Sequence, residues 1–79
     1  MARISEFRPG NQNVREHPTE VDCLWQVFNS ASGQKLLHLT TFGSNERMSA
    51  PKSSQSLQLD ANGAQSLVDL IRSTFPSVQ

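Results

Sequence analysis

The side chains able to perform catalysis in this chain are few and far apart in the sequence. Cys23 is the only cysteine, and His17 and His38 are the only histidines. A reactive thiol needs an accessible and electropositive environment, whereas Cys23 stands beside Leu24 and Trp25 in an apolar run, where a small buried hydrophobic side chain is expected. A structural zinc site needs four ligands at closer spacing than these residues offer.

Other catalytic and cofactor motifs are missing from the sequence. The four glycines are scattered and form no phosphate-binding loop. The acidic residues Glu16, Glu20 and Asp22 fall in or next to a polar segment, where carboxylates usually keep a loop solvated. We therefore expect a protein that is not an enzyme and that uses no metal and no cofactor.

Recognition by cations and aromatic rings is the chemistry that remains. Cations next to strand aromatics suit single-stranded DNA or RNA, because cations follow the phosphates while bases stack on the rings. A polar stretch at 43–54 is long for a hairpin loop and is either a functional loop or a plain loop tip. The candidate nucleic-acid-binding residues are Phe28, Lys35, His38, Phe42, Arg47 and Lys52, and the other candidate cations are Arg3, Arg8 and Arg15.

Two strands must position most of these residues. The run at 21–28 is rich in β-branched and aromatic residues and has apolar residues on both faces. It therefore predicts a central strand that is partly covered on both sides. A hairpin connection with Gly33 should follow, because glycine supplies the positive φ that such loops need. The next strand is expected at 35–42.

A third strand and one helix complete the predicted fold. Leu57 and Leu59 alternate with polar residues at 55–59, which is typical of a half-buried strand. Asp60 is a good N-cap for a helix over 60–75, and Arg72 in its last turns is favoured by the helix dipole. The apolar stripe of this helix consists of Ala64, Leu67, Val68, Ile71 and Phe75.

The order of elements predicts an α+β fold: a three- to four-stranded antiparallel meander sheet followed by one C-terminal helix packed on one face. Residues 1–20 form a possible edge strand and a polar arm, 21–59 the sheet, 60–75 the helix and 76–79 a tail. The helix should cover the face that holds Leu37, Leu39, Leu57 and Leu59, together with Trp25 and Val27. The other face should show Leu24, Gln26, Phe28, His38, Thr40, Phe42, Ser56 and Gln58.

Length and charge limit the classes of function. The chain has 79 residues and a formal net charge of zero, so any nucleic-acid site must be a local patch rather than a global field. A single domain this short has a marginal core, and without a disulfide or a metal we expect it to form a homodimer. The sequence shows no apolar leader and no membrane span, so we expect a cytoplasmic protein with no membrane partner.

The C-terminal half has the features of a known family. They are an alternating strand that ends at the aromatic Phe42, a polar loop with Arg47 and Lys52, a short strand ending at Leu59, and a helix capped by Asp60. From residue 36 to residue 71 the chain resembles the single-stranded-DNA-binding transcriptional coactivators of the positive-cofactor-four family. It departs from the family pattern at Thr40, where an arginine is common, and at Ala64, where a large aromatic residue is common.

This resemblance implies a curved antiparallel sheet with one helix, in a protein that dimerises through its helices. It implies Phe42 as a base-stacking residue and Arg47 and Lys52 as contacts to the nucleic-acid backbone. The first hypothesis is thus a single-stranded nucleic-acid-binding accessory protein of transcription regulation. The second is a small non-catalytic interaction module of phage or plasmid type that docks on another protein through its exposed sheet face.

Overall fold

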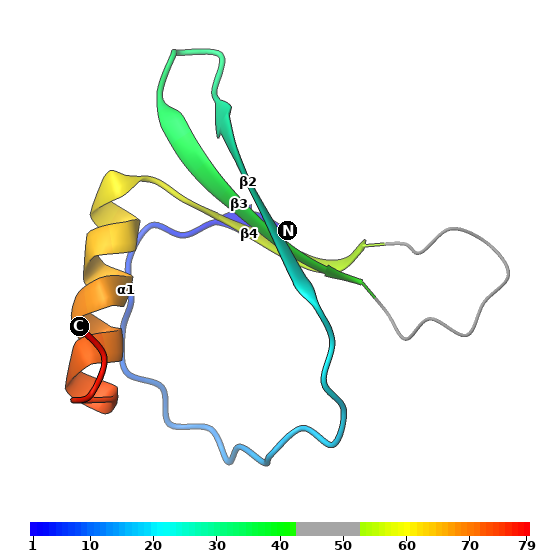
Figure 1. The fold of residues 1–79 in the computed structure, drawn as a ribbon, viewed down its shortest axis with the longest axis vertical. Coiled ribbons are helices and arrows are strands. Elements are labelled where there is room, and N and C mark those ends of the chain that lie inside the picture. Colours follow the sequence, from blue (N-terminus) through cyan, green and yellow to red (C-terminus); the bar gives the residue numbers. More distant parts are fainter. Residues whose placement is uncertain (43–52) are drawn as a thin grey trace, which may run out of the picture.

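A computed structural model describes residues 1–42 and 53–79 of the chain. A four-stranded sheet is followed by one C-terminal helix, which confirms the predicted α+β class (Figure 1). The elements in chain order are β1 (Ala2–Arg3), β2 (Cys23–Asn29), β3 (Lys35–Phe42), β4 (Ser53–Leu59) and α1 (Ala61–Thr74).

The strand order in the sheet is β1-β4-β3-β2. Strands β2, β3 and β4 pair antiparallel, as predicted for a meander. The short strand β1 runs parallel to β4, with Ala2 opposite Leu57 and Arg3 opposite Gln58, so the sheet is mixed rather than purely antiparallel. The Ile4 amide extends this pairing by donating to the Gln58 carbonyl oxygen, at an N···O distance of 2.9 Å.

Strand β2 lies at the edge of the sheet, and the prediction that it is a central strand was wrong. Its apolar residues on both faces suggested cover on both sides, but every residue of β2 except Phe28 is exposed. Cys23, at its first position, is exposed as well, which corrects the expectation of a buried thiol. The Trp25 side chain keeps 70% of its surface accessible.

The β2–β3 hairpin closes through a three-residue turn. The Ser30 amide donates to the Gln34 carbonyl oxygen and the Gly33 amide donates to the Ser30 carbonyl oxygen, each at 2.8 Å. Gly33 has φ +85°, the left-handed conformation that such a turn requires at this position. The sequence-based prediction of Gly33 as the turn residue is confirmed.

Helix α1 begins after the predicted cap. The Asp60 side chain accepts a hydrogen bond of 2.8 Å from the Gly63 amide, which satisfies one of the free N–H groups of the first turn. Arg72 lies in the last turn. No helix within the described ranges has both the length and the apolar content needed to cross a bilayer.

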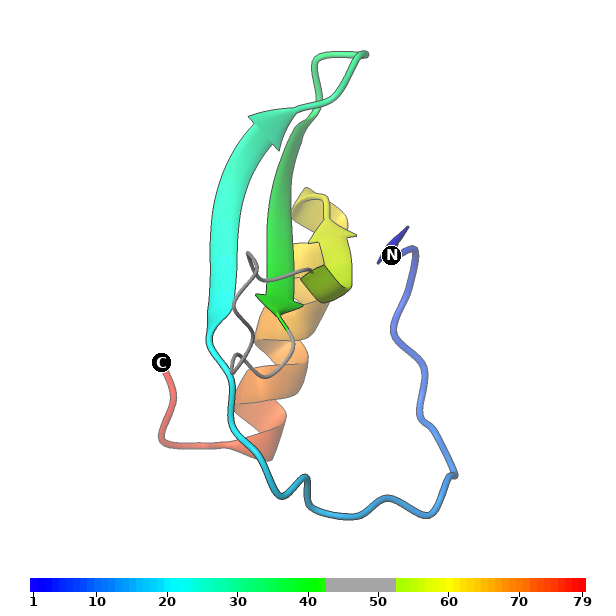
Figure 2. The same ribbon diagram turned by 90° about the vertical axis from the view of Figure 1, so that its right-hand side faces the viewer.

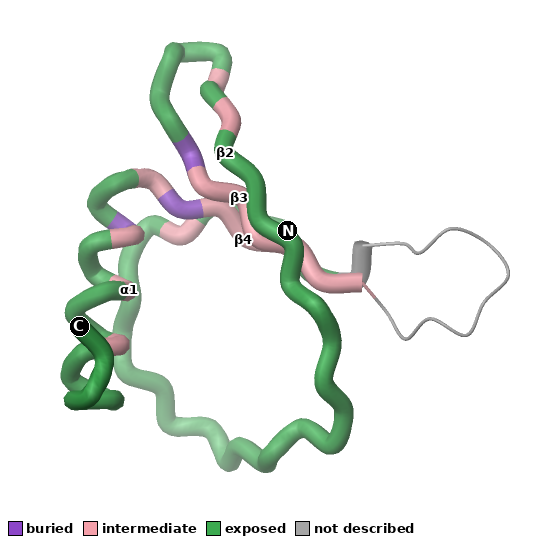
Figure 3. Tube along the Cα trace, in the orientation of Figure 1, coloured by how far each residue is buried: buried purple, intermediate pink, exposed green. Residues whose placement is uncertain are grey.

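The helix covers only a small part of the sheet. Figure 2 shows α1 on one side of the strands, and among the described elements its main contacts are with β4. The buried positions gather where β3, β4 and the first turn of α1 meet (Figure 3), and the buried hydrophobic residues there are Leu36 and Leu59, 4% and 2% exposed. Trp25 and Val27 are exposed, so the expected cover of their face by the helix is wrong on the β2 side.

We expect the substitution Asp60→Ala to lower the free energy of unfolding by about 1 kcal/mol, because the Gly63 amide loses its acceptor. Urea denaturation followed by circular dichroism measures this difference. Asp69→Ala is the matched control, since Asp69 lies in the same helix and accepts only an exposed bond from Gln65. Equal losses in the two variants would contradict a specific capping role for Asp60.

Candidate nucleic-acid interface

The strand register assigns the side chains of the sheet to two faces, because successive residues of a strand point to opposite sides. We name them the His38 face and the Trp25 face. The His38 face holds Arg3, Leu24, Gln26, Phe28, Leu36, His38, Thr40, Ser56 and Gln58. The Trp25 face holds Cys23, Trp25, Val27, Lys35, Leu37, Leu39, Thr41, Gln55, Leu57 and Leu59.

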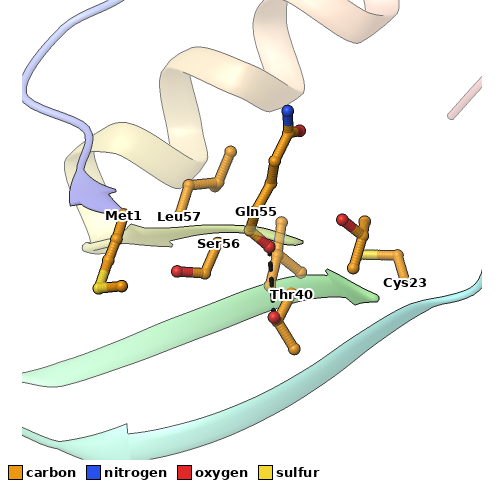
Figure 4. Close-up of a pocket in the computed structure, with 8 residues that line it drawn as sticks. Met1, Cys23, Thr40, Gln55, Ser56 and Leu57 are labelled. Carbon is orange, nitrogen blue, oxygen red and sulfur yellow. Dashed lines mark hydrogen bonds between the residues drawn. The ribbon is translucent and has the colours of Figure 1, made fainter. Parts of the chain in front are cut away.

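The two faces differ in their relation to the helix. In Figure 4 the side chains of Gln55 and Leu57 point to the side of the sheet where α1 lies, whereas those of Thr40 and Ser56 point to the opposite side. Leu59, which also belongs to the Trp25 face, lies 3.4 Å from the position that a Cβ atom would take on Gly63 of α1. The His38 face therefore points away from the helix.

Three side chains from three strands meet at the centre of the His38 face. The rings of Phe28 on β2 and His38 on β3 are in edge-to-face contact, with centroids 6.4 Å apart and planes at 77°. The Gln58 Nε2 atom on β4 lies 3.0 Å from the His38 Nδ1 atom. In this orientation the amide nitrogen donates and Nδ1 accepts, so the two side chains are joined by a hydrogen bond.

Leu36 forms the base of this cluster. Phe28 lies directly opposite Leu36 across the β2–β3 pair, and His38 is the next residue along β3 on the same face. Leu36 is buried, whereas Phe28 and His38 are half-buried, so each ring keeps part of its surface accessible. A half-exposed ring on a buried leucine is held in place and can still present a stacking surface.

Arg3 supplies a cation next to the cluster. The β1–β4 register places Arg3 beside Gln58, and its Nη1 atom donates to the Gln34 Oε1 atom at 3.3 Å. No local pattern in the sequence indicated this position, because it depends on the pairing of β1 with β4. Sequence reasoning counted Arg3 among the cations but did not include it in the site.

The structure separates the sequence-predicted site residues. Phe28 and His38 are in contact on the His38 face. Phe42 is half-buried at the end of β3, next to an irregularity in the β3–β4 register. Lys35 pairs with Asn29 and belongs to the Trp25 face, so it does not share a surface with Phe28. Arg47 and Lys52 lie outside the described residues.

An open hollow of about 400 Å³ lies toward the end of the sheet opposite the β2–β3 turn (Figure 4). The Thr40 hydroxyl donates to the Gln55 carbonyl oxygen at 3.2 Å within it. In the part of the chain that the structure describes, no three His, Cys, Asp or Glu side chains gather closely enough to hold a metal ion. The residues lining the hollow are Met1, Cys23, Leu39, Thr40, Thr41, Gln55, Ser56 and Leu57.

Comparisons of the chain with protein-family models, with curated proteins and with solved structures find no match. Function must therefore be argued from the geometry of the sheet and from the residues that it brings together.

Proposed function

We propose that this protein binds single-stranded nucleic acid across the His38 face, as an accessory protein of transcription regulation in the cytoplasm. The observation that carries the proposal is the meeting of Phe28, His38 and Gln58 on one face, beside the cation of Arg3. These four side chains come from four different strands, and the face that they form points away from the helix.

Each of these groups matches a feature of a single strand. Unpaired bases stack on aromatic and imidazole rings, and amide groups bind the exposed edges of the bases. The rings of Phe28 and His38 offer the stacking surface, while Gln26 and Gln58 offer amides on either side of His38. Arg3 provides a guanidinium for the phosphates, so the zero net charge of the chain does not prevent a local contact.

We further propose that the active form is a homodimer. The described chain has an accessible surface of 7411 Å², whereas a compact monomer of its mass exposes about 4,800 Å². Its radius of gyration is 15.0 Å, and a compact chain of this length has about 11.6 Å. The difference in surface is about 2,600 Å² for one chain and about 5,200 Å² for two copies, which is at the upper end of the total surface that obligate homodimers bury.

A docking module for another protein is the second candidate function. The observation that favours it is the exposure of two large apolar side chains of β2, Trp25 and Val27, which are neighbours on the Trp25 face. Monomeric proteins rarely expose a continuous apolar patch, and such patches usually mark an interaction surface. A second copy of the chain would account for the same patch without a different partner.

The test is a fluorescence anisotropy titration of the protein into labelled single-stranded and double-stranded oligonucleotides at two salt concentrations. We expect single strands to bind more tightly, with log K falling against log salt by about 0.7 for each neutralised phosphate. A slope near this value would match one cation, Arg3, on the His38 face. No binding of either form at low salt would refute the proposed function and favour the docking module.

A further inference from the structure

Among the residues that the structure describes, strand β2 leaves one long edge of the sheet without a partner. It has seven residues, Cys23–Asn29, and it is the last strand in the order β1-β4-β3-β2. Natural sheets protect such edges with charges, prolines or bulges. The sequence CLWQVFN has no charged residue and no proline, and its register with β3 runs without interruption.

The backbone groups at this edge follow from the hairpin. The Ser30 amide donates to the Gln34 carbonyl oxygen across the turn, so the backbone N–H and C=O groups of Ser30 point toward β3. Orientation alternates along an antiparallel strand, and Phe28, Gln26 and Leu24 therefore also face β3. The N–H and C=O groups of Cys23, Trp25, Val27 and Asn29 point to the open edge.

This edge is complementary to itself. An antiparallel pairing of two β2 strands centred on Gln26 uses the whole strand, and it brings Trp25 opposite Val27 and Cys23 opposite Asn29 of the other copy. All four outward-facing residues then become hydrogen-bonded pairs. The pairing places Trp25 opposite the β-branched Val27 and Phe28 opposite the aliphatic Leu24. Pairs of an aromatic with an aliphatic side chain stabilise the pairing of neighbouring strands.

We propose that β2 pairs antiparallel with β2 of a second copy, about a two-fold axis at Gln26, to form one continuous sheet. This rests on the homodimer of the proposed function and assigns its interface. The occupant is a second copy because the pairing satisfies the backbone groups of all four outward-facing residues and places the exposed Trp25 next to Val27 of the other copy.

The pairing also doubles the candidate binding surface. A two-fold axis perpendicular to the sheet keeps like faces on the same side, so the His38 faces of both copies are joined. Gln26 lies opposite His38 in the β2–β3 register, and the two clusters therefore flank the axis. A single strand that crosses β2 would meet both clusters in turn.

Disulfide trapping tests this register, because Cys23 is the only cysteine and can be removed. In Cys23→Ser/Gln26→Cys the two new thiols face each other across the axis, where Cα atoms of a non-hydrogen-bonded pair are about 4.5 Å apart and a disulfide can form. Cys23→Ser/Leu24→Cys is the matched control, since its thiols would be about 13 Å apart along the strands. The native chain should also stay unlinked.

We expect oxidation to link most of the Gln26→Cys variant and little of the Leu24→Cys variant on a non-reducing gel. Equal linking of both, or linking of the control alone, would overturn the proposed register. If Gln26→Cys does not fold, as judged by circular dichroism, Asn29→Cys in the native chain replaces it, because the new thiol would oppose Cys23 of the other copy.

Sedimentation of the native chain separates the possible failures. A dimer that Gln26→Cys does not link would refute the β2 interface and leave the proposed homodimer intact. A chain that is still monomeric at about 100 μM has a dimer dissociation constant above that concentration, which is too weak for an obligate dimer. This result would refute both the homodimer and its β2 interface. Nucleic-acid binding is measured independently by the anisotropy titration, so its failure does not affect the trapping result.

Discussion

Replacing Val27 with proline should dissociate the homodimer while the β2–β3 hairpin stays paired. The Val27 amide faces the open edge, so its loss removes no bond to β3. Proline is tolerated on an edge strand where its missing N–H would face outward. In the proposed dimer, the same loss leaves a carbonyl without a donor at two symmetric places, at about 1–3 kcal/mol each.

The expected result is a rise in the dimer dissociation constant of roughly 30-fold or more, since the two losses sum to at least about 2 kcal/mol and each 1.4 kcal/mol is a factor of ten. Analytical ultracentrifugation over a range of concentrations measures it, and circular dichroism checks that the fold is kept. Phe28→Pro is the matched control, because the Phe28 amide faces β3 and its loss should disrupt the sheet itself. A dimer unaffected by Val27→Pro would mean that β2 is not the interface.

The substitution Phe28→Leu should weaken binding of single-stranded oligonucleotides about tenfold. Leucine keeps an apolar side chain against Leu36 but removes the ring that contacts His38. Stacking of a base on an aromatic side chain contributes about 1–3 kcal/mol, so one lost stacking surface predicts a change of this size. The anisotropy titration measures it at constant salt.

Phe75→Leu is the control for this variant, because Phe75 is an exposed aromatic residue that lies at the end of α1 and far from the His38 face. It should leave the affinity unchanged. Two variants that each remove one positive charge extend the test. Arg3→Gln should reduce the slope of log K against log salt by about 0.7, whereas Lys35→Gln, on the Trp25 face, should leave it unchanged. If Phe28→Leu and Phe75→Leu bind equally well, the His38 face is not the site.

The sequence predicted the separate elements well because local interactions determine them. The alternation of leucines located β3 and β4, Asp60 located the start of α1, and Gly33 located the turn. Each of these signals acts over a few residues, through side-chain period, capping or backbone conformation. The sharing of a face by Phe28 and His38 also followed from the predicted hairpin.

The neighbours of each strand could not be predicted in the same way. A run such as Cys23–Asn29, apolar on both faces, is typical of a central strand, yet β2 is at the edge. Helix α1 starts at β4 and leaves Trp25 exposed. An apolar pattern shows that a residue needs cover, but it does not show whether the cover comes from the same chain or from a second copy.

By itself, the sequence determined the α+β class, the meander of three strands, the helix cap and the two sets of alternating residues. Only the tertiary structure decided that β1 pairs parallel with β4, that β2 is the edge strand of the described sheet, and that Arg3 rather than Lys35 lies on the face that carries Phe28 and His38, where it is next to Gln58. The physical reason is that strand order depends on hydrogen bonds between segments far apart in the chain. These backbone hydrogen bonds have nearly the same energy whatever the side chains are, so no local sequence pattern indicates which segments pair.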